Sequence, residues 1–262
     1  MRNSLRSLRL ATTLGMALAL HAPALHAAEI IGTARSDVLI GSDDDNTNDP
    51  EIQPGGVTAN QSLNNTDVLI GGFGDDVLIG MLGSDVLLGG PGDDILIGGI
   101  DRATAPNSDV QLGGRGNDTA LWAGGDGSDL FDGGSGRRDA LVFGTLDRDP
   151  DTNVPILSHV SGRHAKTGLP TADVTEQGGF CTLEAVHDPD ARGFDFLVRF
   201  FSKANGNLLV TVRTRDVEQV FCTAQNSAEV TFADLTESNP AFAVVTLDAV
   251  QRLNADVARM IR

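Results

Sequence analysis

Short apolar triplets recur at a fixed interval through the first half of the chain. Residues 71–79, 80–88 and 89–97 read GGFGDDVLI, GMLGSDVLL and GGPGDDILI, so three consecutive nine-residue units each end in aliphatic side chains. The six residues before each triplet are rich in Gly, Asp, Asn and Ser, which favour turns. Each unit therefore predicts a tight turn followed by a very short strand.

The nine-residue period continues in less regular units on both sides. The unit at 62–70 keeps the triplet, and the period returns at 104–112 and 113–121. Looser copies begin at Gly124 and Gly133, and an isolated copy lies at 32–40. One triplet cannot bury its own side chains, so the units must stack. Because alternate strand residues face opposite ways, the middle residue of each triplet is predicted to point inward. These residues are Leu39, Leu69, Leu78, Leu87, Leu96, Phe131 and Leu141, and Gln111 and Ala120 interrupt the set.

An aspartate occupies the sixth position of most units. Stacked turns would bring these carboxylates within about 5 Å of one another, where their repulsion opposes folding. Calcium takes six to eight oxygen ligands from carboxylates and backbone carbonyls, whereas soft metals prefer the sulfur or imidazole that the units lack. The pattern therefore predicts calcium ions between turns. The aspartates in regular spacing are Asp67, Asp76, Asp85, Asp94, Asp109 and Asp118.

The unit GGxGxDxUx, with U apolar, resembles the nonapeptide of the RTX (hemolysin-type) calcium-binding family. The resemblance covers roughly residues 32–144. It implies a parallel β-roll in which two nonapeptides form one coil and calcium lies between neighbouring turns on the same side. By position, ions would be shared by Asp67 with Asp85, Asp76 with Asp94, Asp85 with Asp109, Asp94 with Asp118, and Asp109 with Asp129.

The resemblance also assigns turn glycines to the calcium sites. They are Gly71, Gly72, Gly74, Gly89, Gly90, Gly92, Gly113, Gly114, Gly116, Gly124, Gly125 and Gly127. The sequence departs from the family pattern at Met81 and Leu82, in the unit at 80–88. Arg138 stands where the last unit should carry its aspartate, and Asp139 follows one place late. Residues 41–61 and 98–103 are insertions.

Residues 1–27 have the features of a secretory signal peptide. Arg2, Arg6 and Arg9 precede an apolar run from Leu10 to Leu20, and small residues follow around Ala27. The run is too short for a membrane anchor, and no later stretch is long and apolar enough to span a bilayer. We therefore expect an exported mature chain without a transmembrane span, secreted or extracellular, with the periplasm as the other possible destination.

The composition changes near residue 145, which suggests one unit at 28–144 and another at 145–262. In the second unit, Phe194, Phe196, Val198 and Phe200 alternate as in a half-buried strand. Asn205 and Gly206 suggest a hairpin turn before a return strand from Leu208, and residues 217–222 and 228–233 are candidates for two more strands. A helical stripe runs through Leu247, Val250, Leu253, Val257 and Met260. The fold class is therefore all-β, a roll closed by a small β-rich cap with a terminal helix.

The two cysteines, Cys181 and Cys222, lie at the edges of predicted strands. In an exported protein they are expected to form a disulfide, which contributes about 4 kcal/mol in the chain-entropy model. The alternative is a nucleophilic cysteine acting with His187 or His164, although no cysteine-protease sequence surrounds either residue.

Charge and motifs narrow the function. The formal net charge of −17 argues against nucleic acid and against anionic membrane surfaces. The chain has no HExxH or nucleophile-elbow motif, and residues 28–61 are too few for a catalytic domain. Asp43–Asp45 and the run Asp147, Asp149, Asp151 are interpreted as solvated loops, because the latter lacks the Gly and Glu of an EF-hand.

These observations predict a non-enzymatic, exported calcium-binding protein with a structural or adhesive role and an unidentified surface or matrix partner. Two alternatives remain open. One is a secreted enzyme with an unrecognised active site in the C-terminal region, and the other is a calcium-triggered adhesin.

Overall fold

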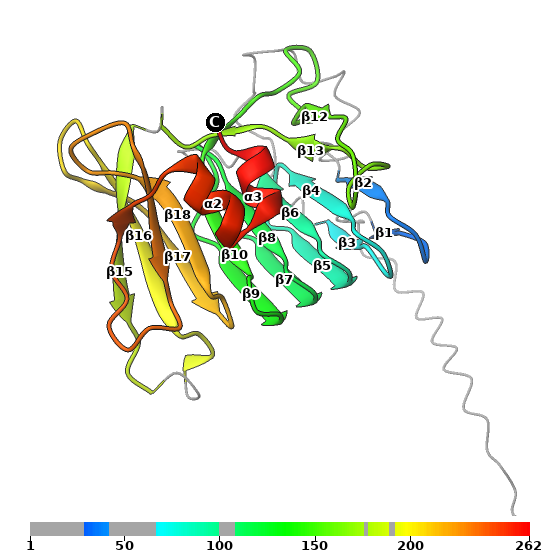
Figure 1. Cartoon of the computed structure of the whole chain (residues 1–262). Coiled ribbons are helices and arrows are strands. Elements are labelled where there is room, and N and C mark those ends of the chain that lie inside the picture. The colour runs from blue at the N-terminus through cyan, green and yellow to red at the C-terminus, as the bar shows by residue number, and fades with distance from the viewer. Residues whose placement is uncertain (1–28, 42–66, 100–107, 176–177, 189–191) are drawn as a thin grey trace, which may run out of the picture.

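The computed structural model describes residues 29–41, 67–99, 108–175, 178–188 and 192–262 (Figure 1). The predicted signal peptide and the acidic run Asp43–Asp45 lie outside these residues. The roll strands are β1 Glu29–Ile31, β2 Val38–Ile40, β3 Val68–Ile70, β4 Val77–Met81, β5 Val86–Pro91, β6 Ile95–Gly99, β7 Val110–Arg115, β8 Thr119–Trp122, β9 Leu130–Ser135 and β10 Ala140–Phe143.

Consecutive strands of the roll alternate between two parallel sheets. One sheet runs β1-β3-β5-β7-β9, and the other runs β2-β4-β6-β8-β10. Val68 pairs with Val86 and Val77 pairs with Ile95, so a strand lies beside the one two units further along the sequence. Two nonapeptides therefore form each coil, and the predicted parallel β-roll is confirmed.

The interior of the roll is a ladder of aliphatic side chains. All seven predicted middle residues are buried, and Leu69, Leu78, Leu87 and Leu96 are completely inaccessible to solvent. Gln111 occupies one of these interior positions between Leu87 and Phe131 on neighbouring strands. The alternation of side chains within each triplet thus decides which residue enters the core.

The two sheets differ on their outer faces. Strands β4, β6, β8 and β10 are buried on both faces, whereas β5, β7 and β9 show alternating burial. Leu169, Ala172, Val257 and Met260 join the outer side chains of the first group in one apolar cluster. The segment after residue 144 and the last helix therefore cover one sheet of the roll (Figure 1).

That covering segment contains β11 Thr145–Leu146, β12 Leu157–Ser158, β13 Leu169–Pro170 and β14 Ala172–Asp173. They form two small antiparallel pairs, β11 with β14 and β12 with β13.

Residues 145–262, which we call the cap, also extend both roll sheets. The cap strands are β15 Gly179–Ala185, β16 Phe196–Ser202, β17 Leu208–Arg215, β18 Gln219–Thr223, β19 Val230–Asp234 and β20 Ala243–Val244. Strand β17 pairs in parallel with β9, and β18 pairs in parallel with β10. Beyond them the pairing becomes antiparallel, so the sheets pass from roll to cap without a break.

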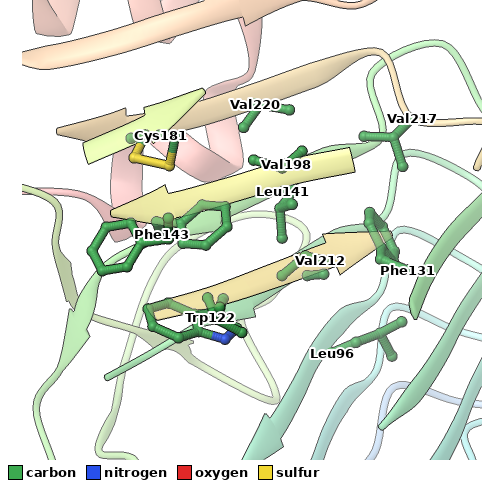
Figure 2. Close-up of a cluster of buried hydrophobic side chains, with 14 of the residues drawn as sticks. Leu96, Trp122, Phe131, Leu141, Phe143, Cys181, Val198, Val212, Val217 and Val220 are labelled. Carbon is green, nitrogen blue, oxygen red and sulfur yellow. A yellow bond between two sulfur atoms is a disulfide. The ribbon is translucent and has the colours of Figure 1, made fainter. Parts of the chain in front are cut away.

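The core at the junction contains the disulfide and an aromatic cluster (Figure 2). Cys181 on β15 is bonded to Cys222 on β18, with 6.1 Å between their Cα atoms, which confirms the predicted disulfide and joins the two sheets. Trp122, Phe143 and Phe200 form three ring contacts with centroid separations of 5.0–5.4 Å. The interior of the roll and that of the cap therefore form one hydrophobic core.

The terminal helical stripe forms two short helices, α2 Leu247–Leu253 and α3 Ala255–Met260. Asn254 has extended backbone angles and interrupts the helix. Its side-chain oxygen accepts hydrogen bonds from the backbone N–H groups of Asp256 and Val257, both at 3.1 Å. This capping explains the break in an otherwise regular stripe. Within the described residues, the helices fall short of the length and apolar character needed to cross a membrane.

Candidate metal centres

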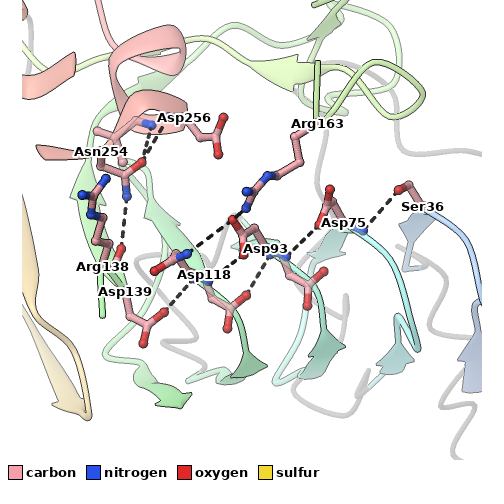
Figure 3. Close-up of polar contacts among 12 residues, drawn as sticks. Ser36, Asp75, Asp93, Asp118, Arg138, Asp139, Arg163, Asn254 and Asp256 are labelled. Atoms are coloured by element: carbon pink, nitrogen blue, oxygen red, sulfur yellow. Dashed lines mark hydrogen bonds and ion pairs between the residues drawn. The ribbon is translucent and has the colours of Figure 1, made fainter. Parts of the chain in front are cut away.

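The aspartates that precede β2, β4, β6, β8 and β10 form one row, which we call the even ladder: Asp37, Asp76, Asp94, Asp118 and Asp139. Figure 3 shows the hydrogen-bonded pair of Asp118 and Asp139 in this row. Each backbone N–H donates to Oδ1 of the next aspartate in the row, at 2.7–2.8 Å. The parallel strand register fixes this stacking, because each aspartate directly precedes a paired strand.

A second row, the odd ladder, runs along the other edge of the roll. Asp67, Asp85, Asp109 and Asp129 precede β3, β5, β7 and β9. Their backbone N–H groups donate to Oδ1 of the next aspartate at 2.7–2.9 Å. All five aspartate pairs suggested by the family resemblance are therefore brought together in the structure.

Two members of the even ladder were missed from the sequence. Asp37 belongs to the isolated unit at 32–40, whose strand pairs with β4 across 39 residues. Asp139 lies one place later than the repeat requires, yet Ala140 pairs with Thr119 and brings Asp139 beside Asp118. Asp37 stands at the sixth position of its unit, so the repeat pattern was a signal that could have identified it. Asp139 does not stand at that position, and only strand pairing reveals it.

Apart from half-buried Asp37, the ladder carboxylates are almost entirely removed from solvent. The exposed fraction is 0% for Asp76, Asp118 and Asp139, 1% for Asp94 and 2% for Asp129. In all five, Oδ2 is buried and has no hydrogen-bond partner among the described residues. A buried carboxylate with an unsatisfied oxygen is costly unless a proton or a cation compensates its charge.

Burial changes the acidity of these groups. Burial, the largest cause, acts together with the charges of neighbouring carboxylates to raise the pKa of Asp94 and of Asp139 to about 7 and that of Asp118 to about 8. Burial also raises the pKa of Asp129 to about 6, while the charge of Arg213 lowers it. Without a counter-ion, Asp94, Asp118 and Asp139 therefore hold protons at a pH where ordinary aspartates are ionised, whereas hydrogen bonds from Thr33 lower the pKa of Asp37 at the end of the row.

Glycine turns surround these oxygens with backbone. A Cβ built on Gly71 would come within 2.5 Å of Asp76 Oδ2 and within 2.7 Å of the Gly89 carbonyl oxygen. Asp76 Oδ2 and the carbonyl oxygen of Gly89 in the next coil thus both face the space beside Gly71, which the side chain of any other residue would fill. Since calcium is bound by carboxylate and carbonyl oxygens together, the residues present fit this ion.

Several turn glycines also adopt left-handed backbone angles. Gly90 and Gly114 have φ values of 111° and 113°, which residues with a side chain rarely adopt. Met81 replaces a glycine in the unit at 80–88 and still has a φ of 80°. The departure from the repeat at this position therefore preserves the shape of the turn.

The predicted glycines are not equivalent. Gly71, Gly89 and Gly113 face the Oδ2 atoms of the aspartates in their own units. Gly124 instead has open space around it, and the carbonyl oxygen of Gly127 accepts a hydrogen bond from the Trp122 indole at 3.1 Å. The turn at 124–129 therefore differs from the regular turns in the surroundings of its glycines.

An outer row of polar residues lies beside the even ladder, on residues that each precede a ladder aspartate. Asp75 Oδ1 accepts the backbone N–H of Asp93, and Asp93 Oδ1 accepts that of Asn117, both at 2.9 Å (Figure 3). Arg163 from the cap forms an ion pair with Asp93. The positive charge beside this outer row is thus an arginine side chain of the protein itself.

The remaining candidate residues form ordinary structural contacts. Asp149 Oδ1 accepts hydrogen bonds from Asp151 and Thr152 within its own loop. Buried His164 contacts Thr167 through Nδ1 at 3.1 Å. Because the disulfide uses both thiols, the nucleophilic-cysteine alternative is wrong.

The donor set also restricts the kind of metal. No cluster of three or more His, Cys, Asp and Glu side chains suited to a metal ion occurs in the described part of the chain. The candidate sites instead combine pairs of aspartates with backbone carbonyls, a set that suits calcium and not zinc.

Fold and site together define a β-roll repeat protein with stacked aspartate turns. A family model for the RTX calcium-binding nonapeptide repeat matches four copies, at residues 29–47 and 64–102. The chain therefore carries RTX calcium-binding nonapeptide repeats, and repeats of this family bind Ca²⁺. No curated protein and no solved structure matches the chain.

Proposed function

We propose that this chain is an exported, non-enzymatic protein whose roll, residues 28–144, is stabilised by Ca²⁺ bound along both ladders. The observation that most supports this proposal is the row of buried aspartates whose unsatisfied Oδ2 atoms face glycine turns. Calcium would neutralise these carboxylates and bind the nearby carbonyl oxygens. The proposed ligands are the ladder aspartates and the turn glycines named from the repeat.

Export supplies the condition for this mechanism. The signal-peptide features of residues 1–27 support delivery to a compartment in which disulfides form, and the buried Cys181–Cys222 bond agrees with that destination. Extracellular calcium modules bind at roughly 10⁻⁴–10⁻³ M. We propose that the roll stays open at low cytoplasmic calcium and closes after export.

A structural or adhesive role accords with the construction of the molecule. The roll and the cap, residues 145–262, share one core, and the disulfide leaves no free cysteine among the described residues. Pull-down of the protein on cells or polymers, with and without calcium, tests adhesion. Activity appearing in a broad hydrolase screen would contradict the non-enzymatic assignment.

The experiment for calcium itself is a far-UV circular dichroism titration of the purified protein with Ca²⁺ and, separately, Mg²⁺. We expect a cooperative gain of β signal with Ca²⁺ only, because Mg²⁺ needs a tighter octahedron and retains water. Asp76→Asn should reduce the response, since it removes a ladder charge and keeps the acceptor for Asp37 N–H. The matched control is Asp151→Asn, at an exposed loop position. An unchanged spectrum with no heat of calcium binding would overturn the proposal.

A further inference from the structure

Strand β18 of the cap occupies the position of another roll strand. Ala140 pairs with Gln219, which places Glu218 opposite Asp139. The Asp139 N–H donates to Glu218 Oε2 at 2.8 Å, as Asp118 N–H donates to Asp139 Oδ1 at 2.7 Å. Gln219 N–H donates to the Asp139 carbonyl at 3.0 Å, as Ala140 N–H does to that of Asp118 at 2.8 Å. Glu218 therefore continues the even ladder from outside the repeats.

The cap reaches this position with a shorter turn. Asp132 pairs with Arg215 and Asp139 stands opposite Glu218, so seven positions along the roll correspond to three along the cap. A glutamate has one methylene more than an aspartate, and this extra length accounts for the choice of residue on a turn that has lost its glycines.

The shorter turn also supplies a carbonyl oxygen. A Cβ built on Gly133 would overlap the carbonyl oxygen of Asp216 and lie 2.9 Å from Cγ of Asp139. In the roll, Gly71 likewise faces the Gly89 carbonyl and the Asp76 carboxylate, but there the nearest carboxylate atom is Oδ2, whereas Oδ2 of Asp139 lies where a Cβ built on Gly136 would overlap it. Asp216, with a φ of 48°, thus presents its carbonyl where a turn glycine of the next coil would.

The electrostatics of the junction are those of an incomplete site. Asp139 is fully buried and its Oδ2 has no hydrogen-bond partner among the described residues. Burial raises the pKa of Glu218 as well, and the charge of Asp216 adds to this. The carboxylates of Asp139 and Glu218 and the carbonyl of Asp216 therefore lie around one turn at the junction, and a hard divalent cation is the ligand that such oxygens accept.

The odd ladder, in contrast, ends without a carboxylate from the cap. Leu130 pairs with Arg213, so Val212 stands opposite Asp129 and provides no carboxylate. Burial raises the pKa of Asp129 to about 6 against the opposing charge of Arg213, whose Nη2 donates to the Ser128 carbonyl at 3.1 Å. An arginine of the cap thus places a positive charge near the last aspartate of this ladder and partly compensates it.

From this asymmetry we infer that Asp139 and Glu218, with the Asp216 carbonyl, form a calcium site that joins the roll to the cap. The site rests on the proposed calcium function but lies outside the nonapeptide pattern. With this site, the cap joins the even ladder through a bound ion, whereas at the end of the odd ladder the cap attaches to the roll without an ion. Calcium binding in the roll then stabilises β18 directly.

The test is to count bound calcium ions by native mass spectrometry of the full chain. Glu218→Gln keeps an acceptor for Asp139 N–H and removes the charge, so we expect one ion fewer than in wild type. Glu237→Gln, an exposed glutamate of the same cap, should bind the wild-type number. An unchanged count in Glu218→Gln overturns the junction site and leaves the ladder sites intact. If wild type binds no calcium, the proposed function fails and the junction site fails with it.

Hydrogen exchange of the wild-type protein gives a second, independent readout if Glu218→Gln does not fold. Calcium should slow amide exchange in residues 216–221, on the cap side of the junction. Exchange there that is equal with and without calcium, while residues 71–97 become protected, would show that the ions stop at the roll and would overturn the junction site.

Discussion

Asp118 donates its backbone N–H to Oδ1 of Asp139 over 2.7 Å, although 21 residues separate them where a regular coil has 18. The extra residues are accommodated in the connections between strands, because Thr119 and Ala140 still pair directly. Strand register, and not the residue count, therefore decides which acid enters a ladder.

The position of Asp118 in the even ladder predicts opposite effects of one substitution under two conditions. In excess calcium, Asp118→Asn should lower the melting temperature by roughly 5–10 °C, from the loss of about 2.7 kcal/mol of ligand stabilisation at a hundredfold excess over Kd. In chelator, the same variant should be more stable than wild type at neutral pH, because it removes a buried carboxylate whose pKa is about 8.

Thermal unfolding followed by circular dichroism measures both effects. Asp151→Asn controls for the loss of an acid at an exposed position and should melt with wild type in both buffers. Destabilisation of Asp118→Asn by equal amounts with and without calcium would mean that the carboxylate has only a structural role.

The repeat predicted most of the roll, because turn glycines and apolar triplets specify local structure independently of the rest of the chain. It could not reveal that β4 is buried on both faces, since the covering residues Leu169 and Val257 lie far away in sequence. For the same reason the contribution of Glu218 was hidden. Its place in the ladder depends on the pairing of β18 with β10, and nothing near Glu218 in sequence resembles a nonapeptide.

The raised pKa values of the even ladder predict the pH dependence of the calcium-free protein. Asp94, Asp118 and Asp139 have folded pKa values of about 7 to 8 against an ordinary 3.8. The folded state then binds more protons than the unfolded state between these values, so stability falls as pH rises. Chelated protein should lose melting temperature steadily from about pH 5 to 8.

Excess calcium should remove this trend, because protons and metal compete for the same oxygens. Melting curves at several pH values, with chelator and with calcium, make the comparison. A melting temperature that rises with pH in chelator would contradict the compensation of these carboxylates by protons.

Gln111 is a polar residue in the aliphatic interior. Its exposed fraction is 3%, it pairs with Leu87 and Phe131, and its Oε1 has no hydrogen-bond partner among the described residues. Gln111→Leu should therefore raise the free energy of unfolding by about 1–3 kcal/mol, the cost of an unsatisfied buried group. Urea unfolding in calcium measures this, with Gln251→Leu on the exposed face of α2 as control. A destabilised Gln111→Leu variant would show that the amide is needed in the roll.

The disulfide should stabilise the cap chiefly by linking its two sheets. Replacing both Cys181 and Cys222 with Ala should lower the free energy of unfolding by about 4 kcal/mol, as expected for closing a loop of 41 residues. Urea unfolding with intrinsic fluorescence from Trp122 reports on this junction, because its ring contacts Phe200 of β16. Equal midpoints for the variant and the wild type would exclude a stabilising role for the bond.

Arg213 should stabilise the protein in a pH-dependent way, because it compensates a carboxylate that is ionised only above its raised pKa of about 6. Arg213→Gln should lower the melting temperature at about pH 8, and the loss should shrink near pH 5, where Asp129 is protonated in both proteins. The hydrogen bond to Ser128 is lost at either pH and costs about 1 kcal/mol, so the difference between the two pH values isolates the charge. Arg115→Gln, at an exposed position on β7, should change neither melting temperature. Equal losses for Arg213→Gln at both pH values would show that the arginine acts through the hydrogen bond alone and does not replace a cation at the end of the odd ladder.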